Sequence, residues 1–263
     1  FQMSSHKIID LRKARVLISN DDGIHAQGIK VLEKTFKALA REIWVVAPET
    51  EQSAVAHALT LRRPLKVRHI SGKRYAVDGT PTDCVLLAIN EIMKDNPPDL
   101  IVSGINNGSN IGEDVTYSGT VAAAIEGLIL GVPSIAFSQH FQDGKRVHWN
   151  TAAHCIPKVM KKLTGMSLPK HTLLNVNFPD VISKEVTGME ITSQGELKFG
   201  DYVHEGKDPR GNPFYWIGSQ RLKEEYKKGT DISAIENGAV SITPLSINLT
   251  NTSVLRSMKK VFS

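Results

Sequence analysis

Arg15-Val16-Leu17-Ile18-Ser19-Asn20-Asp21-Asp22-Gly23 is the stretch that decides the fold, because a short apolar run ends there in two adjacent carboxylates. The run is rich in β-branched side chains, as is typical of a strand buried inside a parallel sheet. Ligands of open parallel sheets bind beyond the carboxyl ends of the strands, where Asp21 and Asp22 are expected. Two interpretations are open from these residues alone. Either a cation offsets the repulsion between the carboxylates, or one Asp caps the next helix in a solvated turn.

On both sides of this stretch, short apolar runs alternate with segments whose apolar residues recur at helical spacing. Strands are expected at residues 16–18, 43–47, 66–69, 75–77, 100–102 and 134–137. Helices are expected at residues 27–39, 82–93, 120–130 and 151–163. This βαβ succession predicts an α/β fold with a doubly wound, mostly parallel, Rossmann-like sheet that carries helices on both faces.

The sequence predicts three parts. Residues 1–14 form an N-terminal extension, whose first three residues are typical of a tag remnant. Residues 15–170 form the α/β core that carries the predicted chemistry. Residues 171–263 complete this core and include a projecting β-hairpin arm at about 197–220, where aromatic residues alternate with Gly, Pro and charged residues. Further strands are expected near residues 173–177, 189–191 and 238–244, and a final helix over 253–262.

Composition excludes several classes of protein. The net charge is +5, but the lysines and arginines are scattered, so no stable nucleic-acid partner is expected. No apolar run approaches the roughly 20 residues that span a bilayer, so no membrane partner is expected. The two cysteines, Cys84 and Cys155, lack the spacing of a zinc site or a disulfide framework, which indicates a reducing, cytoplasmic location. Cys84 is interpreted as a small buried residue, with a reactive thiol at a helix start as the alternative.

Later segments also begin where an expected strand ends, so they converge with Asp21 and Asp22 on one edge of the sheet. Ser53 follows the strand at 43–47 and, read alone, caps a helix over 54–58. His57 is expected to be a packed, hydrogen-bonded residue rather than a general base. The segment 103–110 is almost entirely Gly, Asn and Ser, and the carboxamide oxygen of Asn106 is a hard ligand suited to magnesium or manganese.

Ser118, Gly119 and Thr120 directly precede an expected helix. The free N–H groups at a helix start bind phosphate, although an ordinary cap is the alternative. The chain has neither the lysine of a Walker A loop nor a GxGxxG fingerprint. The carboxylates, a hydroxyl, a carboxamide and a phosphate cradle together predict a metal-dependent phosphoester hydrolase, in which a cation orients the phosphate and activates water.

These segments resemble the SurE family of survival-protein nucleotidases over most of the chain, from about Arg15 to Leu245. The matching motifs are SNDDGIHAQGI from Ser19, APETEQSA from Ala47, VDGTPTDCV from Val77, SGINNGSNIGEDVTYSGTVAAAIEG from Ser103 and SITPL from Ser241. Ala54 departs from the family pattern, in which many members have glycine there.

The resemblance implies a set of site residues and an activity. It implies that Asp21, Asp22, Ser53 and Asn106 hold one Mn²⁺ or Mg²⁺ ion per subunit, and that Asn110 and Ser118-Gly119-Thr120 contact phosphate. It also implies hydrolysis of nucleoside 5′- and 3′-monophosphates, with short polyphosphate as a further substrate, and dimers or tetramers formed through C-terminal arms. Asp231 matches a recurrent family dipeptide and is expected to cap a helix, with a part in the partner's active site as the alternative.

A second hypothesis is a nucleotide-binding stress protein that does not turn its ligand over. A third is a phosphatase directed mainly at polyphosphate or sugar phosphates.

Overall fold

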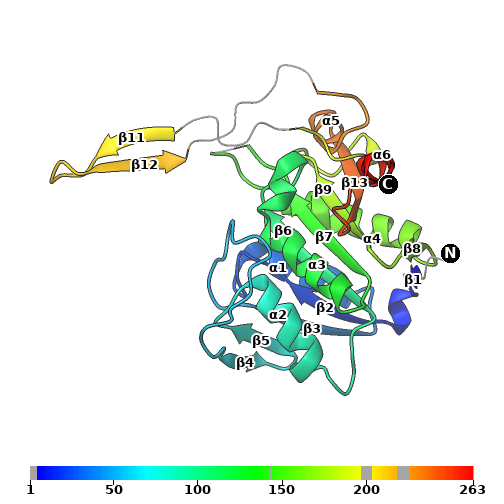
Figure 1. Ribbon diagram of the computed structural model, residues 1–263. Coiled ribbons are helices and arrows are strands. Elements are labelled where there is room, and N and C mark those ends of the chain that lie inside the picture. The colour runs from blue at the N-terminus through cyan, green and yellow to red at the C-terminus, as the bar shows by residue number, and fades with distance from the viewer. Residues whose placement is uncertain (1–4, 143, 197–202, 218–225, 263) are drawn as a thin grey trace.

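The computed structural model describes residues 5–142, 144–196, 203–217 and 226–262. A nine-stranded sheet forms the centre of the protein (Figure 1). In spatial order its strands are β10 (Gly188–Ile191), β13 (Ala239–Ser246), β9 (Thr172–Phe178), β7 (Ser134–Gln139), β6 (Leu100–Asn107), β2 (Arg15–Ser19), β3 (Glu42–Pro48), β5 (Arg74–Val77) and β4 (Val67–Ser71).

The sheet is parallel from β5 across to β9. Only its margins depart from this direction, because β4 runs antiparallel to β5 and β13 antiparallel to β9. Val16, Leu17 and Ile18 of β2 are fully buried between β3 and β6, which explains the continuous apolar run in this strand. The predicted doubly wound, mostly parallel sheet is confirmed.

Helices cover both faces of the sheet (Figure 1). The helices α1 (Gln27–Lys37) and α4 (Trp149–Leu163) pack on one face around a core that includes Phe36 and Phe137. The helices α2 (Pro81–Leu87) and α3 (Gly119–Ile129) pack on the other face. In the described residues, no helix is both long and apolar enough to cross a membrane.

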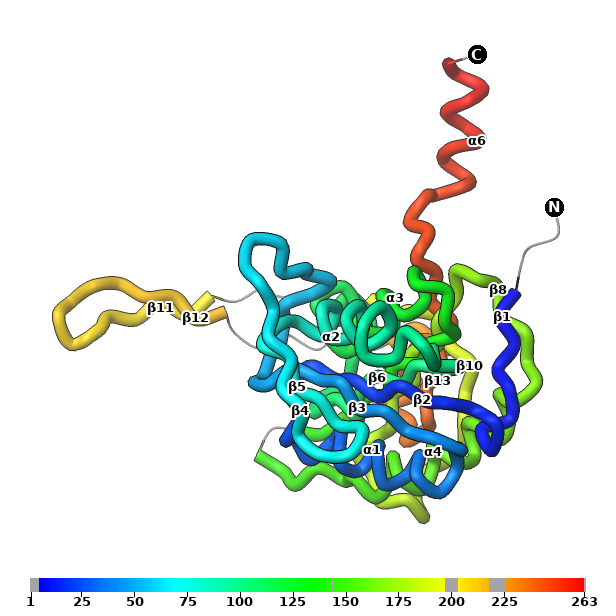
Figure 2. Tube along the Cα trace, turned by 90° about the horizontal axis from the view of Figure 1, so that it is seen from below, coloured from blue at the N-terminus to red at the C-terminus, as the bar shows by residue number. Residues whose placement is uncertain are grey.

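Several short elements lie outside this sheet and its covering helices. They are β1 (Ser5–Lys7), which pairs with β8 (Ser167–Pro169), the short helices η1 (Leu11–Lys13), η2 (Ala88–Ile92), η3 (Gly112–Thr116) and α5 (Asp231–Glu236), and the C-terminal helix α6 (Thr252–Val261). The strands β11 (Val203–Lys207) and β12 (Pro213–Ile217) form an antiparallel hairpin. Figure 2 shows this hairpin and α6 projecting from the body in different directions. The hairpin lies within the arm expected at 197–220, whose remaining residues 197–202 and 218–220 lie outside the described residues.

The helix expected over 82–93 is present as α2 followed directly by η2, whose single turn is of the wider π-helical form. Two other local expectations were wrong. The strand expected to end at residue 102 continues to Asn107, because a register shift against β7 after Ser103 lets β6 resume its pairing at Asn106. Residues 54–58 form no helix, because Ala54 and Ala56 adopt φ values of 58° and 52°, which a right-handed helix excludes.

Candidate active site

Asp21 and Asp22 lie in a tight turn at the carboxyl edge of β2. The turn is closed by the Asn20 side chain, whose Nδ2 donates to the carbonyl oxygen of Gly23 at 3.0 Å. Gly23 has a φ of +97°, a conformation that glycine adopts at little cost. The backbone of Gln52, from the loop after β3, donates to the carbonyl oxygen of Asp21 at 2.8 Å. The backbone therefore fixes both aspartates at the edge where parallel sheets bind ligands.

The start of α3 holds the Asp21 carboxylate. Asp21 is buried, and its Oδ1 accepts a hydrogen bond from the Thr120 hydroxyl. Gly119 makes this close approach possible, since a Cβ there would lie 2.8 Å from Asp21 Cβ. The positive end of the α3 dipole thus faces a carboxylate.

Asp22 is more accessible than Asp21 and belongs to the same cluster. Its Oδ2 accepts a hydrogen bond from the Asn107 backbone at 3.2 Å. Burial first, and then the charge of Asp21, raises the pKa of Asp22 to about 7. Burial also raises the pKa of Asp21, although its hydrogen bonds from Thr120 act in the opposite direction. The raised pKa values show that the negatively charged form of both carboxylates is disfavoured at this edge of the sheet unless an opposite charge is close by.

Among the described residues, no Lys, Arg or His forms an ion pair with Asp21 or Asp22. The charge of Glu51 raises both of their pKa values further. Over the same residues, no three His, Cys, Asp or Glu side chains are grouped closely enough to hold a metal. A cation here therefore depends on neutral oxygens beside the two carboxylates.

Asn106 supplies one such oxygen. Its Nδ2 donates to the carbonyl oxygen of Gly108 at 2.9 Å, and its Oδ1 lies 3.2 Å from the Thr120 hydroxyl. The Thr120 hydroxyl therefore lies between the carboxamide oxygen of Asn106 and the carboxylate of Asp21. Two carboxylates and a carboxamide oxygen form a hard donor set that fits Mg²⁺ or Mn²⁺. The sequence placed Thr120 at the phosphate, and its contact with Asp21 was missed because the two residues are 99 positions apart.

Ser53 lies in the loop after β3 and is exposed. Its hydroxyl donates to Glu51 Oε1 at 2.8 Å, and so it points to Glu51 rather than to either aspartate. Hydrogen bonds hold this loop against the core on both sides of Ser53. Before it, the Gln52 backbone donates to Asp21, and after it, His57 Nε2 lies 2.9 Å from Glu126 Oε2 on α3. His57 was expected to be packed and hydrogen-bonded, and it has the hydrogen-bonding contact but is exposed rather than packed.

The proposed phosphate-binding residues flank the cluster. The Ser118 hydroxyl caps α3 by accepting from the Val121 backbone at 3.0 Å. Asn110 is buried, and its Nδ2 donates to Ser138 Oγ at 2.8 Å. The backbone N–H of Asn110 donates to Asn177 Oδ1 at 2.8 Å, and the carbonyl oxygen of Asn110 accepts from Asn175 Nδ2 at 2.7 Å. The loop between β6 and α3 is therefore firmly positioned at the same edge.

Two other expectations concern residues away from the carboxylates. Cys84 is fully buried in α2, and burial raises the pKa of its thiol, which supports the interpretation as a small core residue rather than a reactive thiol. The expectation that Asp231 caps α5 was wrong, because Thr230 is the cap and Asp231 is the first residue of the helix. The Asp231 carboxylate instead accepts hydrogen bonds from the backbone N–H groups of Gly112, Gly195 and Ile232.

The fold and this edge define a doubly wound α/β protein with a carboxylate-rich site at the ends of its parallel strands. The family model described as "Survival protein SurE" matches residues 16–201. This chain belongs to the SurE family.

Named relatives support that assignment. The chain is 54% identical to "5'-nucleotidase SurE" of Paramagnetospirillum magneticum over 260 residues, which cover 99% of this chain and 100% of the relative. It is 52% identical to the protein of that name from Parvibaculum lavamentivorans, over 91% of this chain and 88% of the relative. The crystal structure of the SurE protein from Aquifex aeolicus superposes with a TM-score of 0.83 at 42% identity, over 95% of this chain and 100% of the other.

Proposed function

We propose that this chain is a metal-dependent 5′-nucleotidase, which hydrolyses nucleoside 5′- and 3′-monophosphates to nucleoside and phosphate. The observation that carries the proposal is the pair of uncompensated carboxylates, Asp21 and Asp22, beside the start of α3. Such a pair needs a cation, and the adjoining helix start suits the phosphate that the cation would accompany. The names of the relatives agree with this chemistry.

The proposal gives each site residue a role. Asp21, Asp22, Ser53 and Asn106 hold one Mg²⁺ or Mn²⁺, with Asp21 and Asp22 the essential pair. When bound, this ion would neutralise phosphate charge and lower the pKa of a water molecule.

The remaining residues act on the substrate directly. Ser118, Gly119 and Thr120 present the first turn of α3 to the phosphate group, and Asn110 fixes the opposite side. Thr120 also orients Asp21 through their hydrogen bond. Ser53 must turn from Glu51 toward the aspartates to act as a ligand, and its exposed position leaves room for that rotation.

The test measures phosphate release from nucleoside 5′- and 3′-monophosphates, from short polyphosphate and from a sugar phosphate, with metal-stripped protein and added Mg²⁺ or Mn²⁺. Release should require the cation and should be lost in Asp22→Asn. Asp10→Asn is the matched control, because Asp10 pairs with Arg12 near the N-terminus, away from the carboxyl edge. Saturable nucleotide binding without phosphate release under any cation would instead support the nucleotide-binding stress protein. Faster release from polyphosphate or a sugar phosphate than from every nucleotide would favour a phosphatase directed mainly at those substrates.

We further propose that the protein is a homodimer or homotetramer assembled through the β11–β12 arm. Support comes from side chains that the described chain leaves uncovered, since Tyr215, Trp216 and Ile217 are exposed on β12. Helix α6 has no buried residue and also exposes apolar side chains, including Val261. Large uncovered apolar surfaces of this kind mark contacts between proteins.

A cytoplasmic location is proposed because the two cysteines are buried and form no disulfide.

A further inference from the structure

Both backbone groups of Gly112 are held by side chains from two distant segments of the chain. Its N–H donates to Asp231 Oδ2 at 3.0 Å, and its carbonyl oxygen accepts from Gln194 Nε2 at 2.7 Å. Gly112 is the first residue of η3, which leads from β6 to the start of α3. The two contacts therefore fix the middle of the connection that carries Asn110 and Ser118.

The Asp231 carboxylate is buried and makes contacts in two directions. Its Oδ1 accepts from the backbone N–H groups of Gly195 at 2.8 Å and Ile232 at 2.9 Å, while Oδ2 faces Gly112. Gly195 is required for this approach, since a Cβ there would lie 2.9 Å from Asp231 Oδ1. One carboxylate thus joins the connection after β6 to the segment that precedes the arm.

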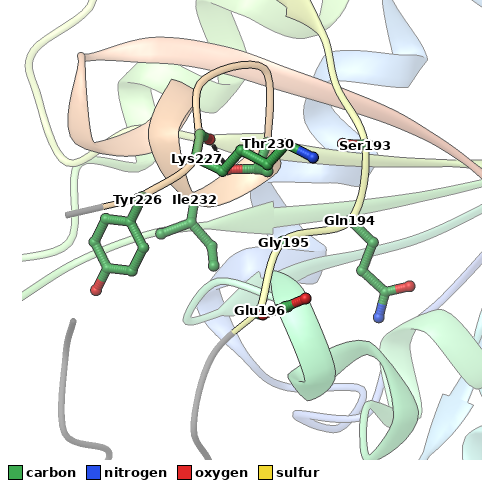
Figure 3. A pocket seen from close by; sticks show the side chains of 8 residues that line it. All are labelled: Ser193, Gln194, Gly195, Glu196, Tyr226, Lys227, Thr230 and Ile232. Atoms are coloured by element: carbon green, nitrogen blue, oxygen red, sulfur yellow. Dashed lines mark hydrogen bonds between the residues drawn. The ribbon is translucent and has the colours of Figure 1, made fainter.

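The surrounding packing supports the same link. Ile111, the neighbour of Gly112, packs against Ile232 and Ile235 of α5 in a small apolar cluster. Figure 3 shows Gln194 and Gly195 on one segment opposite Thr230 and Ile232. The backbone of Asp231 also donates to the carbonyl oxygen of Ser193 at 2.9 Å, which holds these two segments side by side.

We propose that Asp231 is a positioning residue for phosphate binding, because it fixes Gly112 and thereby aligns Asn110 with the start of α3. Gln194 assists by holding the carbonyl oxygen of the same glycine. This role rests on the proposed function, which places Asn110 and Ser118 at the phosphate. Both carboxylate oxygens of Asp231 accept hydrogen bonds from backbone donors, so it acts through Gly112.

Asp231→Asn is the decisive variant because it keeps the size of the side chain. The new amide has one acceptor oxygen, which can serve Gly195 and Ile232, and its NH₂ group then faces the N–H of Gly112, where no hydrogen bond can form. The KM for a nucleoside 5′-monophosphate and the inhibition constant of inorganic phosphate should both rise about tenfold, the effect of losing one hydrogen bond to a charged group. The kcat should stay within about threefold, and Mn²⁺ affinity should stay at its wild-type value.

Asp99→Asn is the matched control. The carboxylate of Asp99 accepts from the Arg15 backbone at 2.8 Å, a contact between segments 84 positions apart at the opposite end of β6. A purely structural role for Asp231 predicts that both variants lower the melting temperature and leave KM and the phosphate inhibition constant unchanged. That result would overturn the proposal.

Gln194→Ala provides a second measurement if Asp231→Asn fails to fold. It removes the other contact to Gly112 and leaves the buried carboxylate in place, so KM and the phosphate inhibition constant should rise in the same direction. Values within twofold of wild type would contradict the proposed role. Inactive wild-type protein would refute the nucleotidase instead, and direct titration of the Mn²⁺-loaded variants with inorganic phosphate would still test the positioning role.

Discussion

Gly119→Ala is predicted to damage the metal site while leaving most of the fold's stability intact. The added Cβ would lie 2.8 Å from Asp21 Cβ, 3.0 Å from Asp21 Oδ2 and 3.2 Å from Pro81 Cγ. Carbon atoms in favourable contact lie about 3.5–4.0 Å apart, so Asp21 or the helix start must move by roughly 0.7 Å. Pro81 restricts retreat of the helix, and Asp21 therefore takes up much of the shift.

The two consequences of this shift differ in size. Overpacking lowers the free energy of unfolding by about 1–3 kcal/mol. The higher helix propensity of alanine over glycine offsets up to about 1 kcal/mol of this loss. The melting temperature should therefore fall by only a few degrees. A displacement approaching 1 Å in a catalytic group lowers activity by about 100-fold, so kcat/KM and Mn²⁺ affinity should fall far more than the stability.

Gly127→Ala is the control on the same helix. Its Cβ would lie 2.6 Å from Ser134 Oγ and would also clash with Ile101, but it contacts neither aspartate. This variant should lose stability and keep the Mn²⁺ affinity of its folded fraction. The assay combines thermal unfolding, calorimetric titration with Mn²⁺ and phosphate release at saturating cation. The reasoning is refuted if Gly119→Ala retains Mn²⁺ affinity and kcat/KM within twofold of wild type.

Three further predictions concern the charge of the site and the arm. Asp21→Asn should lower phosphate release by more than about 100-fold and abolish the stabilisation by added Mn²⁺, with an unchanged circular dichroism spectrum as the check on folding. Because the pKa of Asp22 is raised to about 7, its protonation stabilises the metal-free fold at low pH, and this contribution is lost as the pH rises through about 7. Added Mn²⁺ should therefore raise the melting temperature more at pH 8 than at pH 6, and an equal rise at both would contradict the raised pKa. Trp216→Ser, on the exposed face of the arm, should shift sedimentation toward smaller species, whereas an unchanged mass would exclude this face from the assembly.

The doubly wound, mostly parallel sheet and the position of Asp21 and Asp22 at the end of a buried strand were predictable from the sequence. Buried parallel strands read as continuous apolar runs, and the run in β2 ends at the turn where the chain leaves the sheet. The register shift in β6 was not predictable, because the Gly- and Asn-rich residues that follow Val102 are typical of loops. Their pairing with β7 is a tertiary contact that local pattern does not contain.

The finer contacts of the site depend on residues far apart in the chain. Thr120 approaches Asp21 across 99 positions, and Gly112 meets Asp231 across 119, so spacing alone could not relate them. The loop around Ser53 shows the same limit. Its alanines favour a helix locally, yet Ala54 adopts a positive φ, a conformation that glycine adopts at less cost.

Phosphate release from a nucleoside 5′-monophosphate, followed as Mn²⁺ is titrated into metal-stripped protein, tests the central claim most directly. If Asp21 and Asp22 hold the cation that activates hydrolysis, release is absent without metal and rises saturably with it. Asp22→Asn then stays inactive at every concentration. Full release by the metal-stripped wild type, or by Asp22→Asn, would contradict the account.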